Sequence, residues 1–419
     1  MRSERVIVFL LAAGLLVIPL LYSSGLDVFN LPKELAFRAE AILLLAAGAF
    51  WATAKRRTWS MSPAKSALIL LAVVMAWATV TTVASTNRAL SADTLITIAA
   101  AAAIFVATML AAQTGSVVLI DFLMIGACAN AALVILQELK IWSPFVHEAY
   151  VTGQYASGGF LGNTNYVGTY LAAPALAAIV LTVVGTGKRR WIYAAVAALI
   201  VAGLILSATR TALAALVAGL MLFAFRSRRG ALVMLGVVAV LALLTISPKT
   251  PLGAGARELI DAARKRNYEQ LFSERLLPSL AAVDMIRAHP LVGVGPGCFR
   301  FNFMSYRLRL GEHYAERWTR GYPGYWGAVH DDHLEVAAET GLPGYALFLA
   351  VIGFGAGRLR RRARPEVESR FARAMRWPLA ALVFVLCLGQ FPLELTAPRL
   401  ALLTLGALCV GWDGDDAAD

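Results

Sequence analysis

Twelve apolar segments divide this sequence, and they limit what the chain can fold into more than any other feature. A transmembrane α-helix needs about 20 mainly apolar residues, within a range of roughly 17 to 25. Segments close to this length lie at 6–21, 36–53, 66–84, 94–112, 117–136, 165–184, 191–206, 211–225, 231–246, 342–357, 377–393 and 399–412. The sequence therefore predicts an all-α polytopic membrane protein with about 12 transmembrane helices.

Composition agrees with this fold class and excludes several functions. The chain is 59% hydrophobic and only 15% charged, with a mean hydropathy of +0.68, which is too apolar for a soluble multidomain protein. The net charge of +12 comes from short basic runs between apolar segments, which is typical of topology signals and does not favour nucleic-acid binding. The four cysteines lack CxxC spacing, so neither a disulfide framework nor a zinc site is indicated.

The basic runs also predict orientation. They include Arg2 with Arg5, residues 55–57 with Lys65, residues 188–190, residues 226–229 and residues 358–376, and all fall on one side of the predicted membrane. The positive-inside rule makes that side cytoplasmic, together with both termini. The predicted domains are residues 1–246 with nine transmembrane helices, an outer loop domain at 247–341, and residues 342–419 with three more helices and a cytoplasmic C-terminus.

The segment 247–341 is far longer than an ordinary connection and predicts a folded helical domain. Apolar residues at helical spacing in 254–268 and 271–288 predict helices lying on the membrane surface. The glycine-rich segment 289–297 lacks the flanking elements and the Lys-Ser/Thr end of a phosphate-binding P-loop. An aromatic group then follows, which fits an interfacial belt or a sugar-stacking platform: Trp318, Tyr322, Tyr325 and Trp326.

Residues 329–344 form a dense cluster of histidine and carboxylate side chains. They predict a short polar helix that begins near His330 and ends at Gly341, followed by Pro343 and a membrane span. A helix N-terminus favours the neutral imidazole, whereas the neighbouring carboxylates oppose it, so the net direction of the pKa shift stays open. Alternatively, His330 and His333 share a helix face and suit a divalent metal ion.

Two more features stand out on the outer side. Residues 158–166 combine Gly and Asn just before a span, which fits either a flexible loop or a set of amide donors at the interface. Arg210 lies in a tight turn between two spans, where an arginine is costly unless it is paired or snorkels, and it is therefore a functional candidate.

Four pieces together resemble the O-antigen ligase and polymerase family. They are Gly-Phe-Leu-Gly-Asn-Thr-Asn-Tyr at 159–166, Ser-Ala-Thr-Arg-Thr at 207–211, Arg275 followed by His-Pro-Leu-Val-Gly-Val-Gly-Pro-Gly at 289–297, and His330 with Leu334, Glu339, Gly341 and Gly344. The likeness covers roughly residues 158–357. The sequence departs from the family pattern at Asp331 and His333, where Asn and an aromatic residue are usual, which puts the roles of these two positions in doubt.

The resemblance implies a bacterial inner-membrane glycosyltransferase with a GT-C-like architecture and no cofactor. Such an enzyme moves a glycan from undecaprenyl diphosphate to an acceptor on the periplasmic face. In a ligase the acceptor is a sugar hydroxyl of lipid A-core, and the single large outer segment favours this branch. An O-antigen polymerase or a protein O-oligosaccharyltransferase are the alternatives within the family. A lipid-glycan flippase or transporter fits less well, because the predicted spans carry few charges away from their ends.

The chemistry of that reaction assigns expected roles to individual residues. A departing diphosphate develops negative charge, and the forked guanidinium groups of Arg210 and Arg275 suit its oxygens. His330 is the expected general base, which takes the proton of the attacking hydroxyl. No metal ion is expected, and direct displacement inverts the anomeric carbon. Four further residues are expected to bind substrate: Asn163, Asn165, Arg287 and His289.

Overall fold

The computed structural model describes residues 2–23, 28–54, 65–112, 117–145, 156–271, 275–313, 325–357 and 367–411. These ranges are helical with no strands. The helices are α1 (Arg2–Val17), α2 (Leu31–Ala54), α3 (Lys65–Val83), α4 (Arg88–Ala112), α5 (Val118–Glu138), α6 (Thr164–Val184), α7 (Gly187–Leu206), α8 (Arg210–Ala224), α9 (Arg228–Ile246), α10 (Pro251–Arg264), α11 (Tyr268–Leu271), α12 (Leu276–Ala288), α13 (Phe299–His313), α14 (Asp332–Gly357), α15 (Val367–Cys387) and α16 (Thr396–Gly411).

The predicted fold class is confirmed. Seven of the described helices are long and apolar enough to cross a membrane, namely α3, α4, α5, α6, α7, α9 and α14. Shorter apolar helices lie at Arg5–Leu20, Arg210–Ala224 and Thr396–Gly411. Each of the twelve predicted segments falls wholly or largely on a helix, so the protein is an all-α polytopic membrane protein. Membrane crossings beyond these seven helices stay a prediction.

Helix α6 forms the centre of the bundle. It packs against α7, α8 and α15, and its side chains from Val167 to Leu181 are buried. Alanine is frequent along α6, and small residues let helix backbones approach closely in a membrane, where apolar side chains gain little from leaving lipid. The same reasoning applies to Gly203 of α7, where a β-carbon would lie 2.7 Å from the β-carbon of Ala131.

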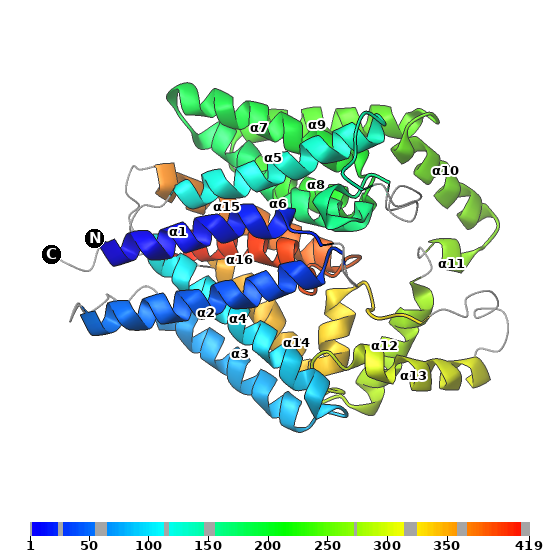
Figure 1. Cartoon of the computed structure of the whole chain (residues 1–419). Coiled ribbons are helices and arrows are strands. Elements are labelled where there is room, and N and C mark those ends of the chain that lie inside the picture. The colour runs from blue at the N-terminus through cyan, green and yellow to red at the C-terminus, as the bar shows by residue number, and fades with distance from the viewer. Residues whose placement is uncertain are drawn as a thin grey trace.

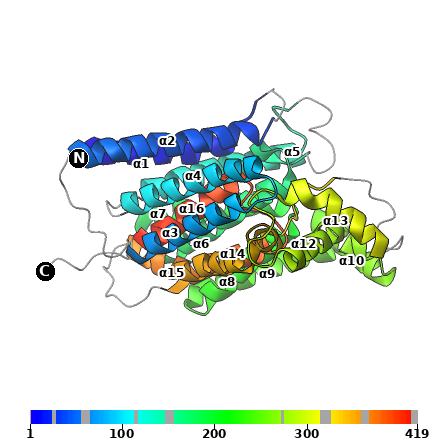
Figure 2. The same ribbon diagram turned by 90° about the horizontal axis from the view of Figure 1, so that it is seen from below.

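The helices α10 to α13 gather at one end of the bundle, opposite the start of α1 (Figures 1 and 2). We call these four helices the cap. The predicted surface helices 254–268 and 271–288 are present, but shorter, as α10 and α12. Helix α13 was missed because its residues mix basic and aromatic side chains without an apolar period. Trp318 and Tyr322 of the predicted aromatic group lie outside the described residues.

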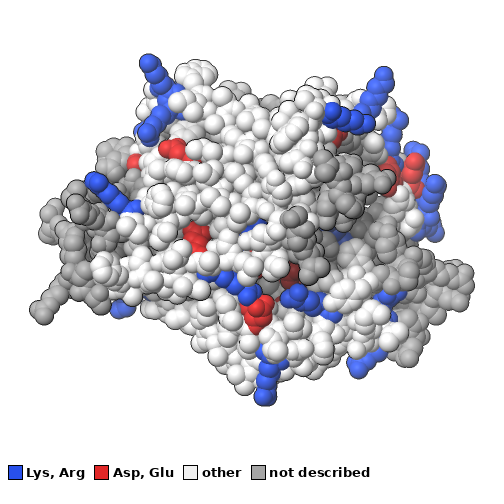
Figure 3. Space-filling view, in the orientation of Figure 1, with Lys and Arg blue, Asp and Glu red and all other residues white. Residues whose placement is uncertain are grey.

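Basic runs from distant parts of the chain meet at one end of the bundle. Lys188, Arg190 and Arg229 line one shallow cavity, and Arg226 donates a 3.2 Å hydrogen bond to the carbonyl oxygen of Arg373. This grouping agrees with the single basic side that the sequence predicts. In Figure 3, much of the visible face carries none of Lys, Arg, Asp and Glu, as expected of helices that face lipid.

Helix α14 is broken as the sequence predicts. Gly341 has φ 72° and ψ 175°, so the polar first part, from Asp332 to Thr340, is separated from the apolar part that follows. Helix α15 differs from its prediction, because 377–393 was expected to be one span and the helix already ends at Cys387. Gly389 and Pro392 lie in the following segment, and both residue types disfavour a helix interior.

Candidate active site

Three residues from distant segments approach one another at the cap end of the bundle. Arg210 is the first residue of α8, Arg275 immediately precedes α12, and His330 lies two residues before α14. Burial lowers the pKa of Arg275, and the positive charge of Arg210 lowers it further, so the two guanidinium groups lie near one another. The charge of Arg275 also acts on His330. The fold therefore brings together the three residues expected to be catalytic.

His330 is held between two aromatic rings. Its ring centroid lies 4.3 Å from that of Phe391 and 5.3 Å from that of Trp326, both in edge-to-face geometry. Its backbone has a φ of 61°, in the left-handed region that non-glycine residues rarely occupy. Such strain is typical of functional sites, where the surrounding structure holds the residue in place.

The structure gives the direction of the pKa shift of His330, which the sequence left open. Burial, and then the positive charge of Arg275, lower the pKa of His330 to about 3. The ring is therefore neutral at physiological pH, the form that accepts a proton. Its Nδ1 atom is buried and has no hydrogen-bond partner among the described residues.

Arg275 connects the cap to the bundle. Its side chain is half-buried, and its Nη1 atom donates a hydrogen bond to the carbonyl oxygen of Gly389, in the segment after α15. The residue takes the N-cap position of α12, where the unpaired backbone N–H groups favour negative charge. An arginine at this point belongs to the cap but contacts the membrane bundle.

The turn before Arg210 is anchored to the start of α6. Thr209 donates a 2.8 Å hydrogen bond from Oγ1 to the carbonyl oxygen of Thr164, and Ala208 has a φ of 53°. A β-carbon at Gly168 would lie 2.3 Å from Thr209 Oγ1, so only glycine permits this close approach. The turn at 207–211 and the start of α6, which are separate in the sequence, thus pack together, and the exposed Arg210 follows this turn.

Asn163 and Asn165 lie at this same helix start. Asn163 is buried, and its Oδ1 atom accepts a 2.8 Å hydrogen bond from the backbone nitrogen of Asn165, which caps α6. The preceding Gly-Asn segment is packed, because the backbone nitrogen of Phe160 donates to Asn130 Oδ1 at 3.1 Å. These contacts pack the segment against the bundle and make Asn163 the cap of α6, while substrate binding by Asn163 and Asn165 stays a prediction.

Arg287 and His289 do not join the cluster. They lie at the C-terminal end of α12, whereas Arg275 lies at its N-terminal end, and 12 residues of helix at about 1.5 Å each separate the ends by roughly 18 Å. Arg287 is exposed and pairs with Asp284 at 3.1 Å. The backbone nitrogen of His289 closes α12 by donating to Met285 O at 2.9 Å. Their role in binding substrate stays a prediction for the extended parts of a large substrate.

The glycine-rich segment 289–297 has a structural role. The backbone nitrogens of Val294 and Gly295 donate to the carbonyl oxygens of Ala338 and Glu339, both at 2.9 Å. The carboxylate of Glu339 in turn accepts hydrogen bonds from the backbone nitrogens of Gly297 and Phe299, both at 2.8 Å. The segment therefore fastens the cap to the polar part of α14, in agreement with the absence of P-loop features from its sequence.

The carboxylates beside His330 serve the start of α14. Asp331 accepts a 3.0 Å hydrogen bond from the backbone nitrogen of Leu334 and so acts as a helix cap. Burial raises the pKa of Asp331. Asp332 is buried, and its Oδ2 atom accepts a 3.0 Å hydrogen bond from the backbone nitrogen of Leu393.

His333 points away from His330, into the bundle. Its Nε2 lies 3.0 Å from Phe384 O, and its Nδ1 lies 3.3 Å from Tyr345 Oη, so both ring nitrogens already have partners. In the described ranges, no three His, Cys, Asp or Glu side chains are grouped so that they could hold a metal ion. The alternative of a metal site on His330 and His333 therefore has no support in this arrangement.

Sequence reasoning missed one part of the site, residues 388–395 between α15 and α16. We call these residues the 388–395 loop. Gly389 accepts a hydrogen bond from Arg275, and the ring of Phe391 packs against that of His330. The backbone nitrogen of Leu393 donates a hydrogen bond to Asp332. Gly389 and Pro392 are the signals for a helix end here, but they stand within a long apolar run that was interpreted as one span.

Comparison with models of protein families finds a match within this chain. Residues 195–349 match the model of a family described as O-antigen ligase. The match covers 155 of the 419 residues, and this part of the chain is similar to the O-antigen ligase family. The matched segment contains Arg210, Arg275 and His330, whereas Asn163, Asn165 and the 388–395 loop lie outside it. A search of curated proteins finds no match to the chain. The match to the O-antigen ligase family model supports a ligase or polymerase type of function in general for this membrane protein.

Proposed function

We propose that this protein is an O-antigen ligase of the bacterial inner membrane. It transfers O-antigen polysaccharide from undecaprenyl diphosphate to a sugar hydroxyl of lipid A-core on the periplasmic face. The observation that carries the proposal is the convergence of Arg210, Arg275 and a neutral, strained His330 at the cap end of an apolar helix bundle. A lipid-linked donor would reach this point from the membrane, while its glycan extends beneath the cap.

The two arginines bind the diphosphate of the donor. Arg210 stands at the N-terminus of α8 and Arg275 at that of α12, so each guanidinium is accompanied by backbone N–H groups that favour an anion. The two positive charges repel each other, and no described carboxylate forms an ion pair with Arg275. A dianion bound between the two guanidinium groups would offset this repulsion. As the glycosidic bond breaks, charge builds on the leaving phosphate, and these contacts strengthen.

His330 acts as general base toward the acceptor. The acceptor oxygen forms a bond with the anomeric carbon, the bond from that carbon to the phosphate oxygen breaks, and the hydroxyl proton goes to the imidazole. Undecaprenyl diphosphate leaves, and a single displacement inverts the anomeric configuration. A bound diphosphate offsets the charge of Arg275, which raises the pKa of His330 from its value in the empty site and makes it a stronger base when substrate is present.

Charge stabilisation by arginine performs the task that a divalent metal performs in many other glycosyltransferases, and the proposal requires no metal ion. An O-antigen polymerase or a protein O-oligosaccharyltransferase would use the same chemistry with another acceptor. The single large outer segment, residues 247–341, favours the ligase. The donor, the lipid A-core acceptor, the inner membrane location and the periplasmic orientation all belong to this proposal.

Gel analysis of lipopolysaccharide from a strain that lacks the gene tests the assignment. We expect the long-chain ladder to disappear while lipid-linked O-antigen accumulates, and a plasmid-borne copy to restore the ladder. A core that carries a single repeat would show a polymerase instead. An unchanged ladder would contradict both assignments and direct attention to protein glycosylation or transport.

A further inference from the structure

The 388–395 loop contacts three residues of the candidate active site and its surroundings: Arg275, His330 and Asp332. Arg275 donates to Gly389 O, the ring of Phe391 meets the ring of His330 at 4.3 Å, and the backbone nitrogen of Leu393 donates to Asp332 Oδ2 at 3.0 Å. Phe391 also contacts Tyr166 at the start of α6, with centroids 5.7 Å apart. The loop therefore forms one wall around the imidazole, although it lies outside the segment shared with the family model.

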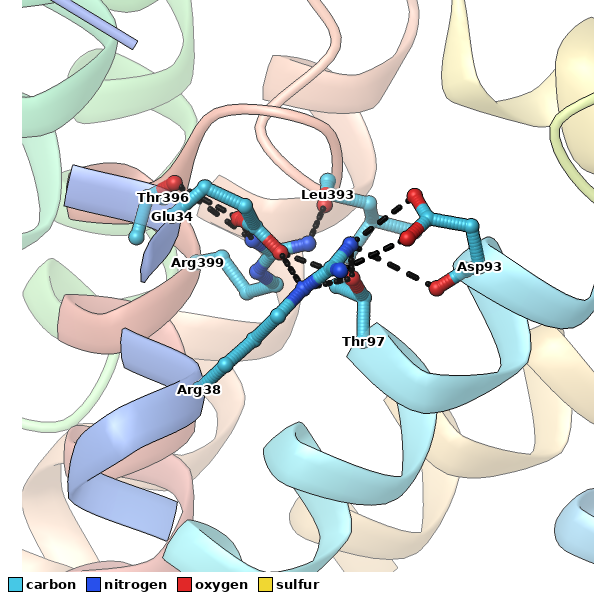
Figure 4. Close-up of polar contacts among 7 residues, drawn as sticks. All are labelled: Glu34, Arg38, Asp93, Thr97, Leu393, Thr396 and Arg399. Carbon is cyan, nitrogen blue, oxygen red and sulfur yellow. Dashed lines mark hydrogen bonds and ion pairs between the residues drawn. The ribbon is translucent and has the colours of Figure 1, made fainter. Parts of the chain in front are cut away.

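Arg399 of α16 holds this loop from the other side. Its guanidinium is buried, with 8% of the residue exposed, and Nη1 donates a 3.1 Å hydrogen bond to the carbonyl oxygen of Leu393. Nη2 forms an ion pair with Glu34 of α2 (Figure 4). One side chain thus joins the loop beside the imidazole to a helix near the beginning of the chain.

Glu34 is the centre of a larger polar network. Its carboxylate accepts hydrogen bonds from Thr396 at 2.9 Å, Thr97 at 2.7 Å and Arg38 at 3.0 Å, besides its pair with Arg399. Arg38 in turn binds Asp93 through both terminal nitrogens, at 2.7 and 3.0 Å (Figure 4). The network connects α2, α4 and α16, so Arg399 is fixed by groups that belong to three helices.

We propose that Arg399, fixed by Glu34, is a positioning residue that sets the orientation of His330 through the 388–395 loop. The assignment of a catalytic effect rests on the proposed function. The claim that Arg399 positions the imidazole does not rest on the proposed function, because it concerns only where the ring of His330 is held. Proton abstraction requires the base to lie within about 2.6 to 3.2 Å of the hydroxyl, and a misplacement of about 1 Å can cost on the order of a hundredfold in rate.

The contacts also explain why the orientation of His330 depends on this loop. The described residues give Nδ1 no hydrogen bond, so ring packing against Phe391 and Trp326 supplies the restraint on the imidazole. Trp326 belongs to the segment that leads into His330, whereas Phe391 comes from outside it. We expect loss of the loop's anchor to loosen the side of the imidazole that packs against Phe391.

The test compares Arg399→Gln and Phe391→Leu with the wild-type protein in matched membranes and in purified form. Tyr193→Phe serves as the control, because it also removes a hydrogen bond within the bundle, from Tyr193 Oη to Asp121 at 2.7 Å, but in the part of α7 near the basic runs. Two measurements are made on each protein: kcat and KM with lipid-linked donor, and the rate at which diethyl pyrocarbonate modifies His330, followed by mass spectrometry with His289 as internal reference.

We expect both variants to lower kcat by tenfold or more while KM for donor changes less than threefold, and to increase the modification rate of His330 relative to His289. Arg399→Lys keeps the charge opposite Glu34 and should recover part of kcat. Tyr193→Phe should match the wild type in both measurements. If Arg399→Gln does not fold, Phe391→Leu alone decides the outcome.

Unchanged kcat and unchanged modification of His330 in correctly folded variants would overturn the positioning role. An equal fall in kcat without a change in His330 modification would also overturn it, since the loop would then act by another route. If the wild type transfers no glycan but the variants expose His330, the positioning relation stands and the proposed function fails. The two failures are therefore distinguishable.

Discussion

The guanidinium of Arg275 donates a hydrogen bond to the backbone carbonyl oxygen of Gly389, a residue 114 positions later in the chain. One N–H group is used in this contact, and an arginine carries five, so the remaining donors are available to a substrate. The bond holds the side chain at the junction between cap and bundle. It also ties Arg275, the proposed ligand of the donor phosphate, to the loop that contacts His330.

Replacing either arginine by lysine tests whether the guanidinium fork matters. A lysine keeps the charge but lacks the paired donors, so Arg210→Lys and Arg275→Lys should each lose on the order of 10² to 10³ in kcat. The measurement is transfer from purified lipid-linked donor at matched protein levels. Full activity in one lysine variant would remove that arginine from the mechanism, and for Arg210 would return it to the role of a snorkelling side chain.

Changing His330 should separate chemistry from donor binding. His330→Gln keeps a polar group of similar size but cannot take the proton, so kcat should fall by about 10² to 10⁴ while the dissociation constant of the donor changes little. Binding is measured with labelled donor in detergent or nanodiscs, and turnover with the same preparation. Near-normal transfer by this variant would exclude His330 as the base. Inactivation of the wild type by chelators, with recovery on adding a metal ion, would contradict the metal-free route.

The pH dependence of kcat/KM reports the free enzyme. A base with the ordinary histidine pKa of about 6.5 would be only about one-tenth neutral at pH 5.5. Because burial and Arg275 lower the pKa of His330 to about 3, the ring stays neutral across this range. We therefore expect kcat/KM to stay nearly constant between pH 7.5 and pH 5.5. A tenfold fall per pH unit below pH 6.5 would show that the free enzyme does not hold His330 in this environment.

Gly341 should tolerate no side chain. Its φ of 72° disfavours any L-residue, at a cost of about 1 to 3 kcal/mol, and a β-carbon would lie 2.1 Å from Leu291 O. Gly341→Ala should therefore lower the thermal unfolding midpoint and the activity together. Gly353→Ala in the same helix is the matched control, since nothing lies within 4 Å of its β-carbon. Equal stability of the two variants would contradict the break in α14.

The sequence was most informative where a pattern is local. Apolar length located the twelve helical segments, and Gly341 with Pro343 located the break in α14. The resemblance to a family singled out Arg210, Arg275 and His330, which lie near one another in the fold, because such a resemblance carries long-range information that periodicity lacks. Whether these residues are catalytic stays a prediction.

Other features depend on contacts between distant segments and left no local signal. The end of α15 at Cys387 was missed because Leu388, Phe391 and Leu393 continue its apolar run past the helix end. The pKa of His330 was undetermined because it depends on burial and on Arg275, which lies 55 positions earlier in the sequence. The capping task of Asn163 and the separation of Arg287 from Arg275 likewise became visible only in three dimensions.

The place of the 388–395 loop in the chain has a consequence for the time at which the site is completed. Arg210, Arg275 and His330 all leave the ribosome before Gly389 and Phe391, since chains are synthesised from the N-terminus. Until α15 and the loop that follows it have joined the bundle, the imidazole lacks one of its two aromatic neighbours and Arg275 lacks its carbonyl partner. A growing chain therefore has no assembled site until the 388–395 loop has been synthesised and has packed against His330 and Arg275.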